Sequence, residues 1–349
     1  MKSKAAIQTV VDQRLIVDEI EIPDPQPDQV IVKLSYSGVC HSQLHQMSNS
    51  ELERPLVLGH EGVGVVTQIG SDVKHVSEGD HAIVTWVPRT PIRGRSAPVT
   101  CGAIYHEELV QGPVYTWGED VLANSEYVVP IPKEHDTDVS CIVGCAVLTG
   151  AGAVLNTARV RPGNSVAVFG AGGVGLCALQ MASLLEAYPV IAVDLKDEKL
   201  EFAKQFGATH GVNSSEVDPV EAIQEISGGG VDFAFDAIGL RATNEQILPA
   251  TRGGGPGAEN HGGMAVLIGI PGKEMTIDPR LFVFNQRQYR GSLGATYPEK
   301  DFPMFLRWYE EGKFPLDKLV TRRYKLDDVN EACDALEAGE ILGRAIIEY

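Results

Sequence analysis

One Gly-rich segment limits the fold more than any other feature of the chain. It fits the pattern G-x-G-x-x-G and consists of Gly170, Ala171, Gly172, Gly173, Val174 and Gly175. An apolar stretch at 165–169 precedes it, a helical spacing of apolar residues follows over 174–187, and Asp194 closes the next apolar stretch. A strand, a Gly turn, a helix and a later acidic residue together form the dinucleotide-binding βαβ pattern. The segment therefore predicts a Rossmann unit.

The residue types in this pattern explain the predicted binding chemistry. Gly172 lets the backbone approach a pyrophosphate, Gly175 lets helix and strand pack closely, and the helix N-terminus supplies unpaired N–H groups. Asp194 is placed to accept hydrogen bonds from the adenosine ribose and would repel a 2′-phosphate, while Leu195 offers no guanidinium. NAD is therefore predicted over NADP. The alternative is a structural glycine turn with a surface aspartate.

Strand-like and helix-like segments alternate through the middle of the chain. Apolar segments at 190–195, 211–213, 231–238, 264–268 and 289–293 are mostly separated by helical patterns. This rhythm predicts an α/β fold with a doubly wound parallel sheet. Residues 1–150 read instead as short β-strands with irregular connections. The tail at 295–349 is too short for a domain, so we expect it to pack on the first one.

Charge and composition exclude several classes of function. The chain has 349 residues, with 47 acidic against 29 basic side chains, for a formal charge of −18. Nucleic acids and anionic membrane surfaces both attract clustered cations, so neither is an expected partner. No stretch has the apolar length of a membrane span or the core of a signal peptide, and six dispersed cysteines indicate no disulfide framework. We expect a cytoplasmic protein.

Three loops punctuated by glycine carry metal-ligating residue types. They are Cys40 in GVCHSQLH, His60 in GHEGVGVV and Cys145 in GCAVLTG. Taken singly, each has an ordinary structural explanation, because cysteine is often a small buried hydrophobe and histidine often a hydrogen-bonded structural residue. No C-x-x-C spacing connects them. The residues alone leave both interpretations open.

The order and separation of four motifs resemble a known family. GVCHS, GHEGVGVV, GCAVLTG and GAGGVG occur in this order, as in the zinc-containing alcohol dehydrogenases of the medium-chain dehydrogenase/reductase superfamily. The resemblance covers essentially the whole chain. It implies a GroES-like catalytic domain formed by residues 1–150 and 295–349, with a Rossmann NAD-binding domain at 151–294 inserted between them.

The resemblance assigns a metal site and a proton relay. It makes Cys40, His60 and Cys145 the ligands of one catalytic zinc per subunit, with a position left open for substrate. Glu61 would be a nearby carboxylate that assists ligand exchange. Ser42 and His45 would form a relay for the proton released by the alcohol.

Hydride would then pass between a zinc-bound alkoxide and NAD, and the reverse reaction would reduce an aldehyde or ketone. The implied partners are a small alcohol or carbonyl substrate and further copies of the chain, as a homodimer or homotetramer.

The resemblance also implies further contacts to NAD. The positions concerned are His41, Thr149, Lys199, Ile238, Ile268 and Arg344. His41 and Arg344 would lie beside the pyrophosphate, Thr149 beside the nicotinamide and Lys199 near the adenosine ribose. For Thr149 the alternative is a threonine that begins a helix, and for Lys199 it is a solvated helix lysine.

Two departures from the family pattern, and three arginines within the first of them, qualify these expectations. The stretch 88–124 contains only Cys101, and one thiolate cannot form a closed four-cysteine site, so no structural zinc is expected. Gln43 stands where the family commonly has aspartate beside the zinc-binding histidine. Arg89, Arg93 and Arg95 form either a solvated loop or subunit contact, or an anion site for an acidic or CoA-linked substrate.

Three other functions share parts of this pattern. A tightly bound NAD would make the protein a nicotinoprotein oxidoreductase, with cofactor that co-purifies. A zinc-free quinone or enoyl reductase has the same two-domain fold but no reason to keep all three proposed ligands. A non-catalytic NAD-binding protein would show no turnover when loaded with metal.

The resemblance places Trp86 as an aromatic wall beside the zinc, where its bulk would favour primary or small alcohols. Trp86→Ala should shift the ratio of kcat/KM for long over short alcohols upward by about tenfold, the effect typical of small changes in an apolar pocket. Steady-state kinetics over an alcohol series measures this ratio. An unchanged chain-length preference would contradict the assignment.

Overall fold

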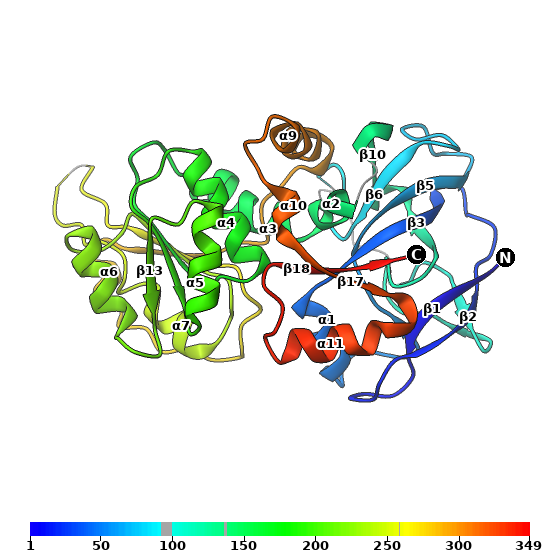
Figure 1. Ribbon diagram of the computed structural model, residues 1–349, viewed down its shortest axis with the longest axis horizontal. Coiled ribbons are helices and arrows are strands. Elements are labelled where there is room, and N and C mark those ends of the chain that lie inside the picture. Colours follow the sequence, from blue (N-terminus) through cyan, green and yellow to red (C-terminus); the bar gives the residue numbers. More distant parts are fainter. Residues whose placement is uncertain (92–99, 136–137, 258) are drawn as a thin grey trace. The chain divides into compact units, whose positions relative to one another are not determined.

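The computed structural model describes residues 1–91, 100–135, 138–257 and 259–349. The chain divides into two compact units, shown in Figure 1. Unit 1 comprises Met1–Cys145, Tyr297–Glu310 and Leu316–Tyr349, and unit 2 comprises Ala146–Thr296 and Glu311–Pro315. These boundaries separate two parts of the chain that each pack compactly within themselves. The division into functional domains at residues 150 and 294 stays a prediction.

Unit 1 is built on two sheets. The five-stranded sheet has the order β4-β1-β2-β7-β8, formed by Leu56–Val57, Lys2–Gln8, Ile16–Glu21, Ile104–Tyr105 and Glu108–Leu109. The seven-stranded sheet has the order β10-β6-β5-β3-β18-β17, formed by Val128–Ile131, His81–Thr85, Glu61–Ile69, Gln29–Val39, Arg344–Glu348 and Val320–Lys325. Its seventh strand, β9 (Asp120–Asn124), also pairs with β3. β3 is therefore the central element of this unit.

The C-terminal segment completes the larger sheet. Figure 1 shows the red strand β18 beside the blue strand β3, and the two pair in antiparallel fashion. Helices of unit 1 are α1, α2, α9, α10 and α11, at His41–Ser48, Asp138–Cys141, Pro298–Glu310, Leu316–Leu319 and Val329–Glu337. The apolar face of α11 packs with β18 and with Trp117, which has no exposed surface. The tail thus belongs to the core of unit 1.

Unit 2 is a six-stranded parallel sheet. The strands are β13, β12, β11, β14, β15 and β16 in sheet order, at His210–Asn213, Val190–Asp194, Val166–Phe169, Phe233–Asp236, Met264–Leu267 and Gln288–Gly291. All neighbouring pairs are parallel. In chain order this is 3-2-1-4-5-6, the doubly wound arrangement that places a ligand crevice beyond the carboxyl ends of the central strands. The predicted α/β fold class is confirmed.

The helices of unit 2 follow its strands, except α3, which precedes the first strand β11. They are α3, α4, α5, α6, α7 and α8, at Ala146–Gly152, Gly173–Leu184, Asp197–Ala203, Pro219–Ser227, Arg241–Gln246 and Arg280–Val283. Helix α4 ends before the predicted limit at residue 187, because Glu186 adopts a left-handed conformation with φ of 60°. A Cβ on Gly175 would lie 1.8 Å from the carbonyl oxygen of Gly170, so only glycine fits where α4 leaves the turn.

The lengths and hydropathy of the helices show whether any of them could span a membrane. Among the residues that the structure describes, no single helix is both long enough and apolar enough to cross a bilayer. One bent pair, Asp138–Gly144 with Ala146–Ala158, reaches the length and hydropathy of a span only when its two parts are taken together.

Candidate metal and cofactor sites

Three antiparallel ladders bring distant parts of the chain to one edge of unit 1. The registers pair Ser37 with Gly62, Glu61 with Thr85, and Val39 with Ala345. The residues at the adjoining strand ends are Cys40 after β3, His60 before β5, Trp86 after β6 and Arg344 at the start of β18. Because partner residues in a ladder lie about 5 Å apart, these side chains are forced into one neighbourhood.

Cys145 reaches the same place from a short turn that follows Ile142–Gly144. The Thr85 hydroxyl donates to the carbonyl oxygen of Gly144 at 2.7 Å and so attaches this turn to β6. The sulfur of Cys145 lies 3.9 Å from that of Cys40 and 3.0 Å from Nε2 of His60. One ligand atom from each of these residues and from Glu61 lies within 4.8 Å of all the others.

The donor set and its spacing fit zinc. Two thiolates on a tetrahedral zinc, with Zn–S bonds of 2.3 Å, lie about 3.8 Å apart. The distance between the two sulfurs here is 3.9 Å. Within the described ranges, this is the group of cysteine, histidine and acidic side chains with metal-binding spacing. Two sulfurs and one imidazole nitrogen form a donor set typical of catalytic zinc.

The surroundings of Cys40 favour its thiolate. The pKa of this thiol lies well below its usual range, chiefly because of the hydrogen bond with Cys145 and also because of the positive charge of Arg344 and the nearby His60. Burial opposes this shift. Since the thiolate is the form that binds metals, the residues around Cys40 favour its role as a metal ligand.

A buried ion pair lies beside the cluster. Glu61 has no exposed surface, Arg344 is 5% exposed, and Nη2 of Arg344 donates to Oε1 of Glu61. A Cβ on Gly38 would lie 2.4 Å from the Glu61 carboxyl carbon, so the glycine makes room for that side chain. Arg344 therefore faces Glu61 in unit 1. Its predicted contact with a pyrophosphate stays a prediction.

Helix α1 carries the predicted relay and pyrophosphate residues in its first turns. Ser42 is half-buried, whereas His41 and His45 are exposed. The rings of His41 and His45 lie 5.6 Å apart, edge to face. Ser42 and His45, three positions apart, share one face of the helix. This face leads from the interior of unit 1 to its surface.

Gln43 on the same helix contacts two of the proposed ligands, Cys40 and His60. Its Oε1 accepts a hydrogen bond from the backbone N–H of Cys40 at 2.9 Å. Its Nε2 lies 2.5 Å from Nδ1 of His60 and donates to the Ser42 hydroxyl at 3.4 Å. Gln43 has no exposed surface. This one amide therefore connects two proposed ligands with the proposed relay.

Trp86 lies beside the histidine of the cluster. The centroids of its ring and the His60 ring are 6.3 Å apart, at an interplanar angle of 75°. Within the described part of the chain, the buried indole Nε1 has no hydrogen-bond partner. The ring therefore borders the metal-binding cluster.

The Gly-rich turn of unit 2 has the form of a dinucleotide site. Gly172 precedes α4, and a Cβ built there meets nothing within 4 Å, so the backbone at the helix N-terminus is open to a ligand. Asp194 ends β12, and its Oδ2 accepts from the backbone N–H of Ala171 at 2.9 Å. This bond holds the carboxylate against the turn. Turn, helix end and carboxylate together fit NAD.

The remaining predicted cofactor residues lie in unit 2. Ile238 and Ile268 follow β14 and β15, so both lie at the carboxyl edge of the sheet. A Cβ on Gly170 would lie 2.6 Å from Cγ1 of Ile238, which shows how closely that side chain covers the turn. Thr149 on α3 carries a buried hydroxyl that lacks a partner among the described residues, and Lys199 on α5 is half-buried.

Sequence reasoning missed Asp236, which shapes this edge. Its fully buried carboxylate accepts from the backbone N–H groups of Ile238 and Gly239 and from the side chains of Thr243 and Asn244. It therefore holds the loop that carries Ile238. The available signal was an acidic residue at the end of an apolar strand, shortly before a glycine.

Other sequence predictions concern residues outside these sites. Cys101 is buried in unit 1 and stands apart from the metal-binding cluster. Arg89 forms an ion pair with Glu299 at 3.0 Å. Arg93 and Arg95 lie outside the described residues, so the three-arginine hypothesis stays a prediction.

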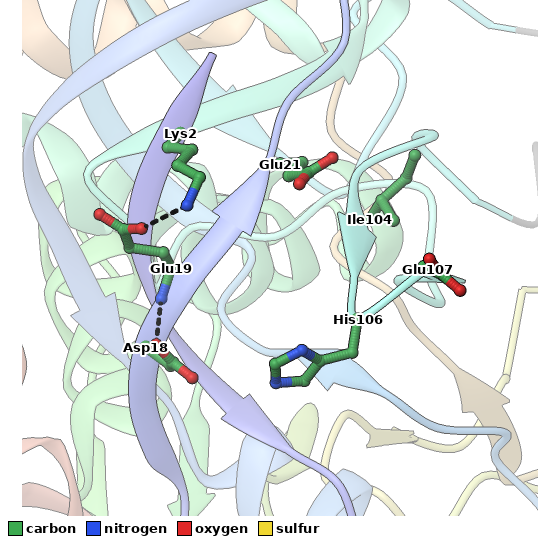
Figure 2. A pocket seen from close by; sticks show the side chains of 7 residues that line it. All are labelled: Lys2, Asp18, Glu19, Glu21, Ile104, His106 and Glu107. Atoms are coloured by element: carbon green, nitrogen blue, oxygen red, sulfur yellow. Dashed lines mark hydrogen bonds and ion pairs between the residues drawn. The ribbon is translucent and has the colours of Figure 1, made fainter.

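A surface pocket of about 570 Å³ lies elsewhere in unit 1, along β2 and β7. Figure 2 shows its lining of Lys2, Asp18, Glu19, Glu21, Ile104, His106 and Glu107. Lys2 donates to Glu19 at 2.9 Å inside this lining. The pocket contains none of the predicted site residues.

Comparison with known proteins extends over the whole chain. Residues 26–133 match the alcohol dehydrogenase GroES-like domain, and residues 173–311 match the zinc-binding dehydrogenase family. An S-(hydroxymethyl)glutathione dehydrogenase from Synechocystis is 33% identical over 377 aligned positions, covering 100% of both chains. A benzyl alcohol dehydrogenase structure from Acinetobacter calcoaceticus is 31% identical with a TM-score of 0.88, covering 100% of this chain and 99% of that one.

A second structure, an alcohol dehydrogenase zinc-binding domain protein from Burkholderia ambifaria, is 30% identical with a TM-score of 0.90, covering 100% of this chain and 99% of that one. Together with the cluster and the dinucleotide turn, these matches define a zinc-dependent dehydrogenase. More narrowly, the chain belongs to the zinc-containing alcohol dehydrogenases of the medium-chain dehydrogenase/reductase superfamily. It transfers hydride between an alcohol and NAD, and the named relatives do not favour a non-catalytic protein.

The buried pair of Glu61 and Arg344 generates a stability prediction. Arg344→Met removes the guanidinium that faces a fully buried carboxylate, and breaking such a pair costs about 3–5 kcal/mol. Removing both charges in Glu61→Gln with Arg344→Met should cost clearly less than Arg344→Met alone. Urea unfolding measures both free energies. A double variant that is less stable than the single variant would contradict the buried pairing.

Proposed function

We propose that Cys40, His60 and Cys145 hold the single zinc ion of this dehydrogenase. The observation that supports this most strongly is the convergence of two sulfurs and an imidazole nitrogen from three separate loops, at a sulfur separation of 3.9 Å. The same proposal makes residues 1–150 and 295–349 the catalytic domain. Residues 151–294 then form the NAD-binding domain.

The reaction needs a route for one proton. When bound, zinc supplies Lewis acidity that favours alcohol ionisation, and NAD supplies the hydride acceptor. Ser42 Oγ is proposed to accept the alcohol proton as its own hydroxyl proton moves on toward His45, which would pass a proton to solvent. Their shared face on α1, with one residue half-buried and the other exposed, supports this direction.

Glu61 is proposed to assist ligand exchange at the metal. Its carboxylate lies within the same 4.8 Å group as the three ligands. Arg344 holds it in a buried ion pair, which would compete with binding of the carboxylate to a metal. Release from Arg344 would allow brief coordination while substrate or product exchanges.

NAD is proposed to bind along the carboxyl edge of the unit 2 sheet. The pyrophosphate would lie over Gly172 and Gly173 at the start of α4, and Asp194 would accept from the ribose hydroxyls. Support comes from the open space at Gly172 and from the hydrogen bond that fixes Asp194 against the turn. The buried hydroxyl of Thr149 would find its partner in the nicotinamide.

We propose a primary alcohol, or the corresponding aldehyde, as substrate. The relatives are named for S-(hydroxymethyl)glutathione and for benzyl alcohol, and both compounds carry a CH₂OH group. Trp86 beside His60 supports the same choice, since a large ring there narrows the space around the reacting carbon.

A cytoplasmic location and self-association are also proposed. Two thiolate ligands are favoured by a reducing compartment, where cysteines stay reduced. Exposed apolar side chains gather along the segment near the edge strand β16 and are 65%, 69% and 72% exposed at Val283, Phe284 and Leu293. A second copy of the chain would cover such a surface, because large exposed apolar patches mark interaction sites.

Self-association is tested by light scattering. The native protein should have the mass of two or four 37.6 kDa chains, and Phe284→Asp should lower that mass by placing a charge in the apolar surface. The matched control is Val217→Asp, which replaces another exposed apolar residue of unit 2 and should leave the mass unchanged. A single-chain mass for the native protein would contradict the proposal.

The ligand set is tested by metal analysis. Cys145→Ser should reduce bound zinc from one per chain to a small fraction, since it removes one of two thiolates. Cys101→Ser is the matched control, because Cys101 is also buried in unit 1 but lies outside the cluster. Retention of full zinc in Cys145→Ser, or equal loss in both variants, would refute the assignment.

A further inference from the structure

The orientation of the Gln43 amide has a consequence for zinc binding. A backbone N–H is always a donor, so the N–H of Cys40 selects the carbonyl oxygen of Gln43 as its partner, at 2.9 Å. The amide nitrogen must then point the other way. It lies 2.5 Å from Nδ1 of His60, so its hydrogen is directed at that ring nitrogen.

This contact determines where a neutral His60 carries its proton. With the amide donating, Nδ1 must accept, and the ring proton then resides on Nε2. Nε2 lies 3.0 Å from the sulfur of Cys145, to which it can donate. The amide, the ring and the sulfur form one consistent chain of donors and acceptors.

Zinc requires the opposite arrangement. Nε2 faces the sulfurs and must offer its lone pair to the metal, so a neutral ring carries its proton on Nδ1. That proton would face the hydrogen of the Gln43 amide, donor against donor. Rotating the amide by about 180° would direct its nitrogen at the backbone N–H of Cys40. Two donors would then face each other at Cys40 instead of at His60. Gln43 has no exposed surface, so bulk water cannot accept a hydrogen bond from either of the two facing donors.

We propose that Gln43 is a positioning residue that lowers the zinc affinity of this site by favouring the His60 tautomer with its proton on Nε2. The inference rests on the proposed ligand set of Cys40, His60 and Cys145. Its consequence is a metal that exchanges faster than the same three ligands would otherwise allow.

Gln43→Glu tests this with an isosteric change. A carboxylate accepts from both the Cys40 N–H and a proton on Nδ1, so zinc should bind about tenfold more tightly, within the range typical of changes beside a ligating histidine. Competition with a chromophoric zinc chelator measures the dissociation constant. In the zinc-free protein, ¹⁵N NMR should show the His60 proton on Nε2 in the native chain and on Nδ1 in Gln43→Glu.

The control separates geometry from charge. Gln46→Glu adds the same charge to an exposed position of α1 and should leave zinc affinity nearly unchanged. Equal tightening in both variants, unchanged affinity in Gln43→Glu, or a native His60 with its proton on Nδ1 would overturn the inference while leaving the ligand set intact. Failure of the native chain and both variants to bind zinc would overturn the ligand set as well. The NMR measurement on the native protein needs no variant to fold.

Discussion

The pairing of β3 with β5 is the constraint on which the metal-binding cluster depends. Cys40 leaves the end of β3 and His60 enters β5, and the antiparallel register of Ser37 with Gly62 places those ends together. A slip of one residue would turn each side chain to the opposite face of the sheet. The ladders of β6 and β18 extend the same edge and add Trp86 and Arg344. The metal-binding cluster therefore depends on the register in which these strands pair.

Burial makes the charges at this edge interdependent. Arg344 neutralises the fully buried Glu61 and also contributes to the low pKa of the Cys40 thiol. Arg344 comes from the last strand, about 280 positions along the chain from Glu61, so the C-terminal segment is needed to balance the charge of the N-terminal one. The last strand of the chain therefore supplies the positive charge that faces the buried carboxylate of Glu61.

Local patterns in the sequence predicted much of unit 2. The Gly-rich turn, the helix that follows it and Asp194 are close in sequence and obey a fixed spacing, so strand, turn and helix were foreseeable. The fold of unit 1 was harder to predict from the sequence, because its ladders join segments far apart in the chain. The three proposed ligands came from family resemblance, whereas their distances required the fold.

Other contacts were not predicted from the sequence. The contact of Gln43 with both Cys40 and His60 depends on side-chain placement across two loops. The partner of Arg344 was also unforeseen, since the residue was expected to face a cofactor. Asp236 was overlooked because its four donors come from backbone and side chains of the following loop and helix.

The central claim is that two cysteines and one histidine of unit 1 bind the catalytic zinc. X-ray absorption at the zinc K edge of the purified protein reads this ligand shell directly. The account predicts two sulfur atoms at about 2.3 Å and nitrogen or oxygen neighbours at about 2.0–2.1 Å. A shell of four sulfurs, or a shell without sulfur, would contradict it.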